Sequence, residues 1–197
     1  LLKDKMVSER QRGMQLIDEP VAFIESTICR RKFVLHYFGE NFEPDNCGLC
    51  DNCKNPKEKI DATKDLVILA ETIAETHEKF DIIYISKILE GAKSNEIVEY
   101  NHNLLPHFGA FKNKDKQYIQ GLIRQAVIGN YLWKDIEQYG VLKFTDKGKD
   151  FLAKPTKFEF TKNHDYKEEA TAMVSAKSGT VLDEKLFDEL MDLRREI

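Results

Sequence analysis

The sequence predicts a mainly α protein of the α+β class, with a helical N-terminal part and one small β-hairpin. Two observations support this class. Apolar residues recur at helical spacing in several segments, and only residues 131–145 read as two short strands around a polar tip. The 197 residues are 42% hydrophobic and 32% charged, as in a globular protein that buries a substantial core. No apolar run reaches the roughly 18 residues of a membrane span.

Two helices are predicted at the N-terminal end. Residues 8–28 place their apolar side chains at helical spacing. The segment CRRKFVLHYFG, residues 29–39, reads as a second helix. Ser26 or Thr27 could cap its start, and Gly39 stands where a C-terminal cap belongs.

A loop and a second domain follow. Residues 41–56 are rich in Asn, Asp, Gly, Pro and Cys, which is typical of a loop. We place the first domain at residues 1–60 and the second at residues 61–160. The second domain is predicted to contain helices over 61–80, 81–91 and 115–128, a helical turn over 94–101, the 131–145 hairpin, and a short helix over 147–154 that Asp146 can cap. Three helices followed by a hairpin is the order of a winged helix.

The C-terminal end reads as a linker and one more helix. Residues 161–182 are polar with little periodicity, which is typical of a linker. Residues 183–197 resume helical spacing, and a helix of this length is not stable alone. Because the chain also lacks a starting Met, we expect it to be a piece of a longer protein.

Four cysteines carry the clearest chemistry. Cys47, Cys50 and Cys53 lie in the segment NCGLCDNC, and Cys29 begins the second helix. Disulfides are one interpretation, but at most two of the clustered cysteines could pair at close range, and no secretory signal is visible. An iron–sulfur cluster is another, although here the fourth cysteine precedes the run. Four thiolates also satisfy tetrahedral Zn²⁺ and leave no position for water, so we favour a structural zinc site.

The cysteine segments also carry a resemblance. CRRKFVLHYFGE followed by CGLCDNC closely resembles the zinc-binding subdomain of the RecQ family of DNA helicases. In that family Arg-Arg follows the helical cysteine, as Arg30 and Arg31 follow Cys29 here. The winged-helix order, with GAFKNKDKQYIQGLIRQ, is similar to the second half of the same C-terminal (RQC) region. DEKLFDELMDLRRE is similar to the opening helix of an HRDC domain, so residues 183–197 are expected to begin a truncated one. The short hairpin is more like bacterial members.

The resemblance implies a parent enzyme that unwinds DNA 3′ to 5′ in DNA repair, recombination and replication, using ATP and Mg²⁺ in motor lobes outside this chain. The chain has no G-x-x-x-x-G-K-[ST] loop to hold phosphates. We therefore expect it to be non-catalytic alone, and to hold double-stranded and forked DNA beside the motor lobes of the same parent chain. The expected location is the bacterial cytoplasm, at the nucleoid and away from membranes.

Phosphate attraction should supply most of the DNA affinity. Residues 100–157 carry ten basic and five acidic residues, whereas residues 61–99 carry four basic and nine acidic ones. The predicted DNA contacts are Lys112, Lys114, Lys116, Tyr118, Arg124, Lys134 and Lys143. Tyr118 could instead pack inward, and Arg124 could instead point back into an ion pair.

Two further groups have an open role. Tyr139, at the hairpin tip, could stack on the terminal base pair and act as a strand-separating wedge, although two acids at the tip repel phosphate. Arg30, Arg31 and Lys32 could meet DNA or the motor lobe, or could offset the negative charge of a Zn(Cys)₄ centre.

A zinc-stabilised winged-helix transcription regulator is the second hypothesis. The predicted third helix carries residues that could read bases in the major groove: Gln117, Gln120, Arg124 and Gln125. A protein-interaction module is the third hypothesis, and it predicts no salt-sensitive DNA binding. The sequence does not identify protein partners.

Overall fold

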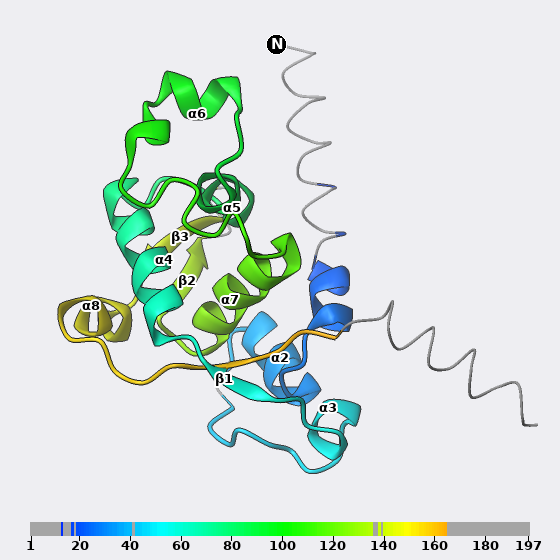
Figure 1. Ribbon diagram of the computed structural model, residues 1–197. Coiled ribbons are helices and arrows are strands. Elements are labelled where there is room, and N and C mark those ends of the chain that lie inside the picture. Colours follow the sequence, from blue (N-terminus) through cyan, green and yellow to red (C-terminus); the bar gives the residue numbers. More distant parts are fainter. Residues whose placement is uncertain are drawn as a thin grey trace, which may run out of the picture. The chain divides into compact units, whose positions relative to one another are not determined.

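The computed structural model describes residues 13, 17, 19–40, 42–135, 138 and 140–164 (Figure 1). The chain divides into two compact units, Leu1–Asn163 and His164–Ile197, and the fold below is that of the first. The expected HRDC helix, most of the expected linker and the hairpin-tip residue Tyr139 lie outside the described residues. No described helix is long and apolar enough to cross a membrane.

The N-terminal part contains two helices and a third, short one. Residues 19–25 are helical, and we call them the 19–25 helix. Helix α2 spans Arg30–Tyr37, and helix α3 spans Asp51–Lys54 inside the segment predicted to be a loop. The first helix therefore ends three residues earlier than predicted, because Ile28 belongs to the tight turn between the two helices.

The start of α2 differs from the prediction, and its end agrees with it. Its N-cap is Cys29, which makes no side-chain cap, so the caps predicted from Ser26 or Thr27 are wrong. The Ser26 hydroxyl instead accepts the N–H of Ile28 at 3.2 Å, inside the turn. Gly39 adopts a φ of 79° just after the helix, and its N–H donates to the carbonyl of His36 at 3.0 Å, as in a glycine-terminated helix.

The second part has the predicted winged-helix order. Its elements are α4 (Thr63–Glu75), α5 (Ile82–Glu90), α6 (Asn95–Glu99), the 3₁₀ helix η1 (His102–Leu104), α7 (Lys116–Ile128), strands β2 (Leu132–Asp135) and β3 (Val141–Phe144), and α8 (Asp146–Ala153). Strands β2 and β3 pair antiparallel, from Leu132 opposite Phe144 to Asp135 opposite Val141. The predicted mainly helical class with a small hairpin is confirmed.

Local capping sets where these helices begin. The Asp81 carboxylate accepts the N–H of Tyr84 at 2.8 Å and caps α5. Helix α8 is capped by Thr145, whose hydroxyl accepts the N–H of Gly148 at 3.0 Å. The expected cap, Asp146, is instead the first residue of α8, because the capping position lies one residue earlier.

The core lies between α4, α5, α7 and the hairpin. Its fully buried side chains include Leu66, Leu69, Ile73, Ile85, Ile88, Leu89, Ile119, Leu122, Ile123 and Leu142. They recur every three or four residues along each helix, so the helical periodicity of the sequence is the periodicity of the core. A separate small cluster joins the N-terminal part to α7 through Ala22, Phe33 and Ile128.

A two-stranded sheet that the sequence did not predict closes the unit. Strand β1 (Lys59–Asp61) pairs antiparallel with β4 (Glu159–Thr161), as the cyan β1 and the orange segment of Figure 1 show. The side chain of Gln125, on α7, accepts the N–H of Thr161 at 2.9 Å and donates to its carbonyl at 2.7 Å. Residues 59–61 and 159–161 are thereby held side by side next to α7.

Candidate metal centre and nucleic-acid interface

The structure brings together the four cysteines. Cys29 precedes α2, Cys50 precedes α3, Cys53 lies within α3, and Cys47 comes from the loop before it. Their sulfurs all lie within 4.8 Å of one another, and those of Cys47 and Cys53 are 3.9 Å apart. A tetrahedral zinc ion with Zn–S bonds of about 2.3 Å places its sulfurs about 3.8 Å apart. The cluster fits such an ion.

All four thiols are free, which excludes the disulfide interpretation for this structure. An iron–sulfur cluster distributes its cysteine ligands around several iron atoms. Sulfurs this close together favour a single ion instead. The site thus fits structural zinc held by four thiolates.

The four sulfurs are so close together that their ionised forms need a bound cation. The backbone N–H groups of Leu49 and Cys50 hold the pKa of the Cys47 thiol down to about 6. Burial, reinforced by the neighbouring sulfurs, raises the pKa of Cys53 to about 12. Four adjacent thiols cannot all ionise unless a positive charge lies between them, and a dication supplies that charge.

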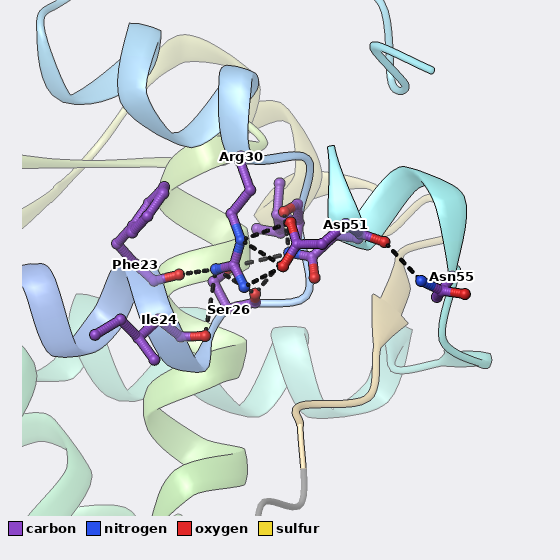
Figure 2. A network of polar contacts seen from close by, with 8 residues as sticks. Phe23, Ile24, Ser26, Arg30, Asp51 and Asn55 are labelled. Carbon is purple, nitrogen blue, oxygen red and sulfur yellow. Dashed lines mark hydrogen bonds and ion pairs between the residues drawn. The ribbon is translucent and has the colours of Figure 1, made fainter. Parts of the chain in front are cut away.

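An arginine holds the cysteine loop against the helical pair (Figure 2). The Arg30 guanidinium donates from Nε and Nη2 to the Asp51 carboxylate, at 3.1 Å and 3.0 Å. Its Nη1 donates to the carbonyls of Phe23, of Ile24 at 3.2 Å and of Ser26 at 3.1 Å. One side chain thus joins the C-terminal end of the 19–25 helix to the first residue of α3.

A buried amide makes a second connection. Asn52 is only 6% exposed, and its Nδ2 donates to the carbonyls of Ser26 at 2.8 Å and Ile28 at 2.7 Å. Asn52 stands beside Cys53, and Ile28 precedes Cys29. These bonds hold opposite sides of the metal site together without using a ligand atom.

Sequence reasoning missed Asp51 and Asn52. Their only signal is their place between the last two ligands, in the segment CDNC. Their partners lie more than 20 residues upstream, so the pairing exists only in the tertiary fold. Of the neighbouring cations, Lys32 pairs with Asp45 at 3.0 Å, and Arg31 is exposed. Contacts of Arg30, Arg31 and Lys32 with DNA or a motor lobe stay predictions.

The predicted DNA contacts divide into exposed and paired residues. Lys112 and Lys116 are exposed, and neither ammonium has a side-chain partner within the part of the chain that the structure describes. Lys114 lies 3.3 Å from the Asp65 carboxylate and 4.4 Å from the centroid of the Tyr118 ring. The Tyr118 hydroxyl also donates to Asp65, and burial, followed by that bond, raises its pKa. Tyr118 thus packs inward, against α4.

Three ion pairs hold the other predicted cations: Arg124 with Glu25 at 3.3 Å, Lys134 with Glu19 at 2.5 Å, and Lys143 with Asp135 at 2.7 Å. The first two cross from the second part of the fold to the 19–25 helix. A phosphate that binds Arg124 or Lys134 therefore has to replace a carboxylate that is already in place.

Helix α7, which corresponds to the recognition helix of a winged helix, is covered on several sides. The Asn163 amide donates to the backbone carbonyl of Gln117 at 2.6 Å, and Gln125 is bound to Thr161 as described above. Gln120 lines a cleft that α7 shares with the 19–25 helix. Among the residues that could read bases, Arg124 and Gln125 have their side chains engaged within the fold.

Comparisons with known proteins match both halves of the chain. A family model described as "RQC domain" matches residues 56–169, and one described as "RecQ zinc-binding" matches residues 2–54. The "ATP-dependent DNA helicase RecQ" of Haemophilus influenzae is 30% identical over 153 residues, which are 77% of this chain and 25% of that protein.

Other relatives are similar over comparable lengths. The "ATP-dependent DNA helicase RecQ" of Bacillus subtilis is 24% identical over 77% of this chain and 26% of its own length. The "ATP-dependent helicase SGS1" of Saccharomyces cerevisiae is 32% identical over 60% of this chain and 9% of its own length. This chain spans about a quarter of the bacterial relatives that it matches.

Proposed function

Because the chain belongs to the RecQ family of DNA helicases, whose zinc-binding and RQC domains it carries, we propose that it holds duplex and forked DNA for an ATP-dependent parent helicase. The relatives that span four times its length are named as such helicases. The motor lobes of the parent supply ATP hydrolysis with Mg²⁺ and 3′-to-5′ movement. This chain is non-catalytic alone, and it acts in DNA repair, recombination and replication by binding DNA.

One observation carries the proposal: exposed lysines gather at the open start of α7. Asp115 is the N-cap of α7, but its side chain accepts no N–H of the first turn. These N–H groups and the positive end of the helix dipole attract a phosphate. Lys116 begins the helix, and Lys112 and Lys114 lie in the turn before it, so three of the five residues 112–116 are exposed lysines, of which Lys114 also pairs with Asp65.

The surroundings of α7 disfavour a transcription regulator. Such a regulator reads bases with side chains of its recognition helix in the major groove. Here Arg124 is bound to Glu25, and Gln125 to the backbone of β4. Binding to DNA phosphates depends little on the DNA sequence, and it needs only the exposed start of the helix.

Zinc has a structural role in this proposal. Cys29, Cys47, Cys50 and Cys53 would hold the ion, which ties the cysteine loop to the helical pair. Four thiolate ligands leave no coordination position for a substrate or water. Its binding contributes to folding directly, by an apparent 10 kcal/mol or more in zinc-finger peptides.

A salt series with forked DNA tests the proposal. If Lys112, Lys114 and Lys116 each meet one phosphate, affinity falls about 40-fold between 50 and 200 mM salt, since the logarithmic slope is about −0.9 per phosphate. Lys116→Gln should make that slope shallower by about one. The matched control is Lys149→Gln, which changes an exposed lysine on α8 and should leave the slope unchanged.

The same samples, analysed before and after chelation, test the metal. We expect about one zinc per chain, and loss of structure in residues 1–60 ahead of the winged helix when it is removed. An iron chromophore would overturn the metal assignment. Fork binding that is independent of salt, or a strong preference for one palindromic sequence, would overturn the proposed grip.

The remaining assignments are proposals of the same kind. We place the zinc-binding subdomain at residues 1–60, the winged helix at 61–160, a linker at 161–182 and the first helix of an HRDC domain at 183–197, in a bacterial cytoplasmic protein that acts at the nucleoid. Tyr139 is proposed as a wedge between strands. A Tyr139→Ala parent enzyme that unwinds DNA normally would rule the wedge out.

A further inference from the structure

A cleft of about 780 Å³ is lined by residues of the 19–25 helix, α2, α7 and β2, and by the start of α5. Trp133, the only tryptophan of the chain, lines it from β2. Neighbouring residues of a strand face opposite ways. Leu132 is therefore 2% exposed in the core, whereas Trp133 is 44% exposed. The largest apolar side chain of the protein thus lines the cleft and is accessible to solvent.

The setting of Trp133 suits a flat, weakly charged ligand. Lys143 lies opposite it in the hairpin, with its ammonium 5.4 Å from the centroid of the indole ring. No aromatic ring in the described residues stacks on the indole. Tyr37, 51% exposed, lines the same cleft from α2. Two exposed aromatic side chains from separate parts of the fold therefore share one cavity.

The charges of the cleft are largely balanced. Glu19 and Glu25 are neutralised by Lys134 and Arg124, while Lys116 has no side-chain partner among the described residues. Glu40 and Asp81 also line the cleft, and Lys143 pairs with Asp135, so a ligand here gains from contact with the rings and not from an excess of positive charge. Exposed rings with a cation nearby match single-stranded nucleic acid, whose bases stack on aromatic side chains. In a duplex interior the base faces are already covered, so only unpaired bases offer them.

We propose that Trp133 stacks on an unpaired base of a single DNA strand that enters this cleft, with Lys116 and Lys143 as nearby cations. The proposal rests on the proposed function, which brings DNA to the winged helix. It adds a second site, for unpaired bases, to the duplex-binding start of α7. Because stacking releases few counterions, binding here depends less on salt than duplex binding does.

The single tryptophan allows a direct test with the full 197-residue chain, purified without chelator. Its fluorescence is followed while single-stranded dT15 is added, and the anisotropy of labelled dT15 measures binding independently. We expect the emission to fall in parallel with binding, and a blunt duplex to change it far less. Trp133→Ala should weaken dT15 binding roughly 5- to 150-fold, whereas Trp133→Phe, which keeps a ring, should lose less. Duplex affinity should stay within about twofold in both variants.

Each contrary outcome has a separate meaning. If dT15 binds but the emission of Trp133 does not change, or if Trp133→Ala binds dT15 as well as the unmodified chain, the stacking proposal is overturned and the duplex grip stands. Quenching by an apolar peptide but not by dT15 would identify a protein-docking cleft and also overturn it. If neither single-stranded, duplex nor forked DNA binds, both this proposal and the proposed function fail.

Discussion

Replacing Asn52 with alanine tests whether the metal site depends on bonds that use no metal. The buried Asn52 amide donates to the carbonyls of Ser26 and Ile28, both in the turn that leads to Cys29. Alanine removes both donors and puts nothing in their place. Asn55→Ala is the matched control, because Asn55 lies one turn later, is exposed, and makes a long 3.4 Å bond to Asp51.

The expected cost follows from the two bonds. A net hydrogen bond contributes about 0.5–1.5 kcal/mol, so Asn52→Ala should destabilise this part of the chain by about 1–3 kcal/mol. That free energy raises the population of the opened loop about 5- to 150-fold. The loop can open locally while the winged-helix core stays folded, since the two have separate apolar clusters. Asn55→Ala should cost a few tenths of a kcal/mol at most.

Zinc transfer to a chromophoric chelator measures this opening. If release passes through the opened loop, Asn52→Ala should transfer zinc faster by the same 5- to 150-fold, and Asn55→Ala within about twofold of the unmodified chain. Far-ultraviolet circular dichroism during urea unfolding checks the stability change separately. Equal release rates and equal stability for Asn52→Ala and the unmodified chain would refute the reasoning, because the two bonds would then contribute nothing.

Three other expectations follow from the ion pairs and from one histidine. Asp51→Asn weakens the exposed pair with Arg30, and should cost at most about 1 kcal/mol in the same urea assay; a larger loss than that of Asn52→Ala would contradict the order proposed here. Glu19→Gln with Glu25→Gln frees two cations and should steepen the salt slope of fork binding by up to about two, while Glu58→Gln should not; an unchanged slope would show that these cations do not meet phosphate. Burial, then the neighbouring charge of His77, lowers the pKa of His102 below 6.5. The unfolded chain then takes up the proton first as pH falls, so this stabilisation is present above about pH 6.5 and lost below it. His102→Gln should reduce the loss of melting temperature between about pH 7 and 5.5, and an identical loss would refute the assignment.

Much of the fold could be predicted from local patterns. The apolar residues of α4, α5 and α7 recur at helical spacing, and Gly39 ends α2 where predicted. The boundaries were less certain, because Cys29 rather than Ser26 precedes α2 and Thr145 rather than Asp146 caps α8. A cap depends on one hydrogen bond, and neighbouring Ser, Thr and Asp residues can all offer it.

The candidate site was predicted unevenly, for a similar reason. The four cysteines were identified because metal chemistry demands particular atoms at particular spacings. The arginines and lysines were identified by charge alone, and charge does not say which acid a cation will meet. The carboxylates that hold Arg124 and Lys134 come from about 100 residues upstream.

Sequence by itself determined the helical periodicity and the hairpin, because each is a pattern of neighbouring residues, and the tetrathiolate donor set, because cysteine supplies the ligand atom wherever it stands in the chain. Only the tertiary structure decided that β1 pairs with β4, that Arg30 and Asn52 hold the cysteine loop, and that Trp133 faces a cleft instead of the core. These features join residues that are far apart along the chain. The packing of whole helices decides which of these residues meet, and that packing cannot be predicted from residues adjacent in the sequence.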